Sequence, residues 1–125
     1  MEGYKISISE VSKELTARER IMLKDTSNAV KLDEAANGDT HLVITPAAYA
    51  VIDIHNEKSD NVDYKNYIIM DASGTKYVTG SPSFWSSFIE IWEEMENESE
   101  EYSIEVYKMD SKNYKGKQFL TCSIV

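Results

Sequence analysis

The sequence contains little cysteine, proline or glycine, and each scarcity excludes a class of protein. Its 125 residues include one cysteine, Cys122, so no internal disulfide can form. Two prolines and five glycines leave little room for a long disordered linker, because such linkers are rich in these residues. No apolar run approaches the roughly 20 residues that a membrane-spanning helix needs, and the first residues lack the apolar segment of a secretory signal. We therefore expect an ordered cytoplasmic protein with no membrane partner.

Metal ligands and catalytic motifs are equally scarce. The two histidines, His41 and His55, and the one cysteine are too widely separated for the clustered ligands of a zinc site. No phosphate-binding loop or dinucleotide-binding glycine motif occurs. Asp53 and His55 share one strand face and could form an acid–base pair, although two polar residues at the open end of a strand explain them better. Cys122 lies in phase with Leu120 and is expected to be a buried core thiol. We predict no metal, no cofactor and no enzymatic activity.

Positive charge is scarce overall and unevenly distributed. The net charge of −9, from 22 acidic and 13 basic residues, argues against a surface that attracts polyanions everywhere. Eight glutamates and no lysine or arginine occur from Glu90 to Glu105, whereas four lysines and one aspartate occur from Lys108 to Lys117. A second basic cluster consists of Lys13, Arg18, Arg20 and Lys24. The average charge therefore conceals two locally basic segments.

The first 39 residues predict short elements. Apolar residues alternate with polar ones from Tyr4 to Ser9, which indicates a half-buried strand. Thr16 and Glu19 form a capping-box pattern, so a short helix should follow through about Lys24. Residues 30–32 could form another short strand, and residues 37–39 a turn.

From Thr40 onward, the pattern predicts three strands, a helix and two strands. The expected strands are one long strand over 41–55, bent near Pro46, then 64–70, 75–79, 102–107 and 119–124, with a glycine turn at 71–74. The helix begins at Ser81 and Pro82 and carries large apolar residues at helical spacing: Phe84, Trp85, Phe88, Ile89, Trp92 and Met95. This order is that of an OB-fold, whose helix closes one end of a five-stranded barrel. We predict a mainly β protein with an OB-fold barrel over 40–125 and an N-terminal extension over 1–39 packed on it.

A binding surface is predicted around the lysine-rich loop between the last two strands. If Ile104, Val106 and Leu120 point inward, Tyr107 and Phe119 point outward. Single-stranded nucleic acid is bound by such rings, which stack on bases, together with cations along the phosphates. In an OB-fold, the loop between the fourth and fifth strands flanks the binding face. The candidate nucleic-acid-binding residues are Tyr67, Lys76, Tyr77, Tyr107, Lys108, Lys112, Tyr114, Lys115, Lys117 and Phe119.

Four segments resemble a known family. They are Lys13-Glu14-Leu15-Thr16-Ala17-Arg18-Glu19, Gly74-Thr75-Lys76-Tyr77-Val78-Thr79, Ser83-Phe84-Trp85-Ser86-Ser87-Phe88 and the ending from Ser111 to Cys122. Together they resemble single-stranded DNA-binding proteins of phages that infect Gram-positive bacteria. The resemblance implies an OB-type core and sequence-tolerant coating of single strands in the bacterial host cell, without a cofactor. Housekeeping counterparts end in an acidic tail that recruits replication enzymes, but this chain ends in an apolar strand.

Two hypotheses follow for function. The first is binding and protection of single-stranded DNA in phage replication or recombination, with phage or host replication and recombination proteins as further partners. The second is an acidic phage inhibitor that mimics DNA and acts on a host enzyme, which the net charge and the glutamate run from 90 to 101 favour. The lysine loop opposes the second, because a mimic gains nothing from clustered cations. A solvated helix face also explains the glutamates.

Overall fold

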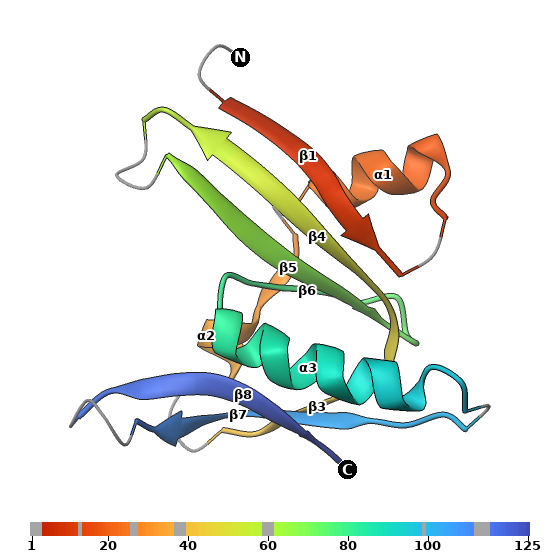
Figure 1. Ribbon diagram of the computed structural model, residues 1–125, viewed down its shortest axis with the longest axis vertical. Helices are drawn as coiled ribbons and strands as arrows, with labels where there is room; N and C mark the ends of the chain where they lie inside the picture. The colour runs from red at the N-terminus through yellow and green to blue at the C-terminus, as the bar shows by residue number, and fades with distance from the viewer. Residues whose placement is uncertain are drawn as a thin grey trace. The chain divides into compact units, whose positions relative to one another are not determined.

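The computed structural model describes residues 4–12, 14–25, 28–36, 40–58, 62–98, 100–111 and 116–125. These residues are mainly strand, as the sequence predicts (Figure 1). The elements are β1 (Tyr4–Val11), α1 (Ala17–Lys24), β2 (Val30–Lys31), α2 (Leu32–Ala35), β3 (Leu42–Ile44), β4 (Pro46–Asn56), β5 (Asp63–Asp71), β6 (Lys76–Thr79), α3 (Pro82–Met95), β7 (Ile104–Asp110) and β8 (Gln118–Ile124). The strands form one sheet in the order β1-β4-β5-β6-β2 and another in the order β3-β7-β8. The single five-stranded barrel stays a prediction. Among the described residues, no helix is both long and apolar enough to cross a membrane.

The chain divides into two compact units. The first unit contains residues 1–30 and 47–80, and the second contains residues 31–46 and 81–125. The predicted division into an extension over 1–39 and a core over 40–125 stays a prediction. The N-terminal strand β1 pairs antiparallel with β4, so the predicted extension shares a sheet with the middle of the chain (Figure 1).

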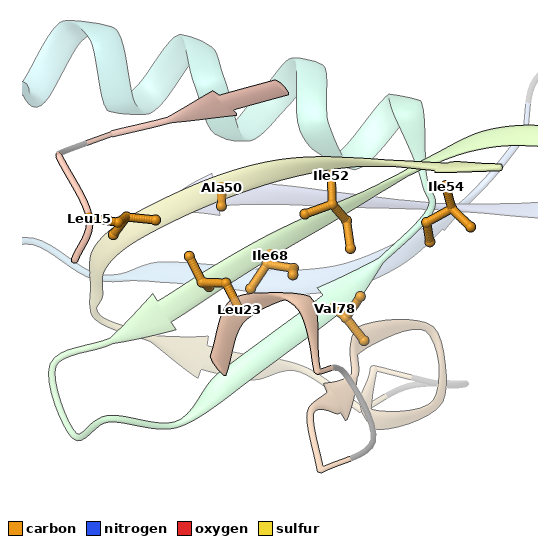
Figure 2. Close-up of a cluster of buried hydrophobic side chains, with 7 residues drawn as sticks. All are labelled: Leu15, Leu23, Ala50, Ile52, Ile54, Ile68 and Val78. Atoms are coloured by element: carbon orange, nitrogen blue, oxygen red, sulfur yellow. The ribbon is translucent and has the colours of Figure 1, made fainter. Parts of the chain in front are cut away.

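The core of the first unit lies between its sheet and α1. Figure 2 shows Leu23 of α1 beside Ile68, with Val78 of β6 and with Ile52 and Ile54 of β4 in the same cluster. The helix begins as predicted: the Thr16 hydroxyl accepts the Glu19 backbone N–H at 3.2 Å, and the Glu19 carboxylate accepts the Thr16 N–H at 3.1 Å. These two bonds satisfy backbone donors that a helix N-terminus otherwise leaves open.

The hairpin between β5 and β6 also forms as predicted. Gly74 has a φ of +91°, a conformation that side chains disfavour. The Asp71 carboxylate accepts backbone N–H groups of Ser73 and Thr75, each at 3.0 Å, and fixes the turn. The hydrogen bonds lower the pKa of Asp71, while its partial burial opposes them.

Two predictions about strands need correction. The single strand predicted over 41–55 is divided at Thr45 into β3 and β4, and Pro46 begins the second of these. Proline has no N–H to donate to a ladder, and the first position of a strand tolerates it. The strand predicted over 30–32 ends at Lys31, because Leu32 begins the four-residue helix α2 and is fully buried.

In the second unit, α3 runs along β8 (Figure 1). Ser81 caps the helix by accepting the Phe84 N–H at 3.2 Å, and Pro82 occupies the first turn, as predicted. Two serines then connect the helix to the strand: the Ser83 hydroxyl donates to the Leu120 carbonyl at 2.9 Å, and the Ser87 and Thr121 hydroxyls lie 3.0 Å apart. The helix thereby covers an edge strand whose backbone would otherwise be open to other chains.

Candidate nucleic-acid interface

The β7–β8 pairing places the predicted rings on one face. Val106 pairs with Cys122, and both side chains are buried, as is Ile104. Side chains alternate between the faces of a strand, so Tyr107 and Met109 lie on the opposite face, and Phe119 pairs directly with Met109. Met109 is 45% exposed and Phe119 36% exposed. The register therefore places Tyr107 and Phe119 on the face opposite to Val106. This face is exposed at its Met109–Phe119 end, whereas Tyr107 is half-buried and its partner Thr121 is buried.

Strand β3 extends this face. Val43, which pairs with Glu105, is 59% exposed. His41 precedes β3, and its ring stacks on Tyr107 with centroids 5.0 Å apart and an interplanar angle of 13°. His41 Nδ1 lies 2.7 Å from the Glu105 carboxylate. We call the surface formed by His41, Val43, Tyr107, Met109 and Phe119 the aromatic face.

His41 is a member of this face that the sequence reasoning missed. The spacing of His41, His55 and Cys122 predicts only that they do not share a metal ion. The position of His41 two residues before Val43, in the same strand phase, is the signal that indicates a shared face. The Tyr107 hydroxyl lies 2.6 Å from the Ser123 hydroxyl, so the ring is held at both its face and its tip.

The lysines of the β7–β8 segment are placed differently from one another. Lys117 is exposed beside the start of β8, and its carbonyl accepts the Ser111 N–H at 2.8 Å. Lys108 lies on the opposite face of β7 from Tyr107, and its Nζ donates to the Asp33 carbonyl of α2 at 2.8 Å. The candidate residues Lys112, Tyr114 and Lys115 lie outside the described residues. In the described part of the β7–β8 connection, the exposed candidate for a phosphate contact is therefore Lys117.

The three remaining candidates belong to the first unit. Tyr67 is half-buried and pairs with Thr79. Tyr77 is only 9% exposed, and its hydroxyl donates to the Asp71 carboxylate at 3.4 Å. Burial and the Asp71 charge raise the pKa of Tyr77. The burial corrects the stacking role suggested by the sequence, because a base cannot reach a core ring.

Lys76 also has a structural position. Its Nζ donates to the backbone carbonyls of Met22 and Asp25, at the C-terminal end of α1. The last carbonyls of a helix lack partners within it, and a cation there is favourable to the helix dipole. We therefore assign Lys76 to capping α1 rather than to phosphate binding.

A charged groove of about 350 Å³ lies along β1, β4 and β5 in the first unit. In it, His55 Nδ1 lies 2.7 Å from the Asp63 carboxylate, and Lys65 Nζ lies 2.7 Å from that of Asp53. These hydrogen bonds raise the pKa of His55 and that of Lys65. Asp53 and His55, considered above as an acid–base pair, thus each have another partner.

The thiol of Cys122 is in the core, as predicted, with 6% of the residue exposed. Burial raises its pKa to about 12. In the described parts of the chain, His, Cys, Asp and Glu form no group of three or more that could hold a metal ion. No family model, curated protein or solved structure matches this sequence.

Proposed function

We propose that the protein binds single-stranded DNA without sequence preference, and that the aromatic face receives the bases. The observation that carries the proposal is the exposed pairing of Phe119 with Met109, on the same face as Tyr107 and His41. A flat ring stacks on any base, at about 1–3 kcal/mol per base, so such a face is tolerant of sequence.

The lysine-rich segment that includes the connection from β7 to β8 supplies positive charge in a chain that is acidic on average. Four lysines and one aspartate occur from Lys108 to Lys117, in a chain with a net charge of −9. A strand should bind beside this segment, because its lysines attract phosphates. Each phosphate neutralised should contribute roughly −0.7 to the slope of log affinity against log salt.

We further propose an OB-type arrangement of the strands. The order from β4 through β5, β6, α3, β7 and β8 supports it, as does the near continuity of β3 with β4 across Thr45. In this arrangement, β3 and β4 are the two halves of one bent first strand, and the lysine-rich connection is the loop that flanks the binding face. Together with the resemblance described above, this supports a role in protecting single strands during phage replication or recombination.

A fluorescence titration tests the proposal. A thymidine oligonucleotide is added to the protein at low and at high salt, and the intrinsic fluorescence of tyrosine and tryptophan is followed. We expect quenching at low salt that high salt reverses. Lys117→Glu should weaken binding to every base sequence alike, whereas Lys58→Glu, at an exposed turn of the first unit, is the matched control and should have little effect.

A second function has one observation in its favour. The glutamates of α3, Glu90, Glu93 and Glu94, are exposed and could present carboxylates to a DNA-binding enzyme. In the titration, an unchanged fluorescence at low salt favours this inhibitor function and contradicts the first proposal. Loss of an enzyme's DNA binding on addition of the protein would then be the next measurement.

A further inference from the structure

Helix α1 exposes two large apolar side chains. Ile21 is 70% exposed and Met22 is 60% exposed, whereas Leu23 of the same helix is buried in a cluster with Ile68 and Val78. Exposed apolar side chains that adjoin one another are a common mark of an interaction surface. The burial of Leu23 explains how α1 is held to its sheet, but it leaves the neighbouring Ile21 and Met22 without a role in the core.

Cations flank these apolar residues. Arg18 precedes Ile21 by three positions and Lys24 follows it by three, so both lie near it on the helix surface, and both are exposed. The acidic residue of the helix, Glu19, turns back to the N-cap backbone of Thr16. The exposed side of α1 is therefore apolar with a basic border.

The second unit carries a surface with the opposite charge. A hollow of about 370 Å³ is lined by apolar side chains and by exposed glutamates. Ile124 and Val125, in its wall, are 50% and 73% exposed. The apolar lining is Met95, Tyr102, Ile124 and Val125, and the glutamates are Glu100 and Glu101.

We propose that α1 of one copy docks into this hollow of a second copy. Ile21 and Met22 would cover the exposed Ile124 and Val125, while the α1 cations meet the glutamates of the hollow. Both surfaces are apolar at the centre and their charges are opposite, a combination that fixes orientation in a protein interface. The contact goes beyond DNA binding and does not require it.

The proposed contact is head to tail. The donor surface and the acceptor surface are different parts of the chain, so a docked pair still offers one free α1 and one free hollow. Contacts of this kind build open chains or rings rather than symmetric dimers. On a long single strand, such contacts would make neighbouring copies bind cooperatively.

A charge exchange tests this contact. Variant one carries Arg18→Glu and Lys24→Glu, and variant two carries Glu100→Lys and Glu101→Lys. All four positions are exposed, so circular dichroism should show both variants folded. Without DNA, sedimentation velocity of the unaltered protein at low salt should show an average mass that rises with concentration, from the low micromolar to the submillimolar range.

Each variant alone should remain monomeric, because its two surfaces then have the same charge. An equal mixture of the two should associate again. The negative α1 of variant one meets the positive hollow of variant two, and the unaltered, positive α1 of variant two meets the unaltered, negative hollow of variant one. Lys31→Glu with Lys58→Glu changes the net charge as variant one does, and this control should associate like the unaltered protein.

Four outcomes overturn the inference: an unaltered protein that stays monomeric throughout, a variant that associates alone as the unaltered protein does, a control that loses association, or a mixture that stays monomeric. Binding of a short thymidine oligonucleotide, which holds a single copy, is measured beside these experiments. Both variants should retain it. A failure of self-association with retained oligonucleotide binding is thus distinguishable from a failure of the proposed DNA binding.

Discussion

Replacing Phe119 by alanine should separate binding from stability. Phe119 is 36% exposed, and its direct neighbour across the strands is Met109. Loss of a cross-strand pair of this kind costs roughly 0.2–1 kcal/mol of stability. Loss of a stacking ring costs about 1–3 kcal/mol of binding to single-stranded DNA, which weakens affinity by about 5- to 150-fold.

Phe88→Ala is the matched control, because it removes the same ring from the core. Phe88 is fully buried, with the rings of Phe84, Trp85 and Trp92 at centroid distances of 6.0, 5.1 and 5.9 Å. The substitution should therefore cost about 3–5 kcal/mol in the free energy of unfolding. It should leave the affinity of the remaining folded protein nearly unchanged.

The two quantities are measured separately. Urea unfolding, followed by tryptophan fluorescence, gives the free energy of unfolding, and anisotropy of a labelled thymidine oligonucleotide gives the dissociation constant. A Phe119→Ala protein that is folded and binds the oligonucleotide as tightly as the unaltered protein would refute the assignment of the aromatic face. Equal losses of stability in the two variants would refute the burial argument.

Three further predictions follow from single groups. Because burial raises the pKa of Cys122 to about 12, its thiol should react with a disulfide reagent in urea but hardly at all in the folded protein, as absorbance of the released chromophore shows. Since the hydrogen bond to Asp63 raises the pKa of His55, the folded protein holds that proton more tightly than the unfolded chain does. The contribution of His55 to the free energy of unfolding is therefore complete below its ordinary pKa and is lost as the pH rises through the raised pKa. The urea midpoints of His55→Gln and of the unaltered protein should differ more at about pH 5 than at about pH 9. An equal difference at both pH values would contradict this. Thr16→Ala removes the acceptor for the Glu19 N–H and should cost about 0.5–2 kcal/mol of stability by urea unfolding, whereas a value near zero would show that the cap is not formed in solution.

Local patterns in the sequence predicted the elements that depend on neighbouring residues. Ser81 and Pro82 mark the start of α3, and the spacing of its apolar residues follows the helical period. The turn at Gly74 was also predictable, because one residue in an unusual conformation defines it. The division of the strand at Thr45 was predictable only in part. Pro46 indicated a bend, but local sequence does not indicate that the two halves join different sheets.

Alternation in a strand gives two faces without saying which of them meets solvent. On the β5–β6 hairpin, Ile68 pairs with Val78 on one face and Ile69 pairs with Tyr77 on the other, and all four side chains are buried. The sequence suggests Tyr77 as a companion stacking ring on the middle hairpin, but the ring lies in the core. When a sheet carries apolar residues on both faces, the sequence lacks the apolar–polar alternation that marks an exposed face.

The sequence by itself determined the order of the main helices and strands, the capped starts of α1 and α3, and that Tyr107 and Phe119 share a strand phase opposite to Val106 and Leu120. These features depend on neighbours a few residues apart. Only the tertiary structure decided that His41 stacks on Tyr107 and that the Lys76 ammonium caps a helix more than fifty residues earlier in the chain. Such contacts arise from strand pairing and packing between distant segments, and no local periodicity specifies them.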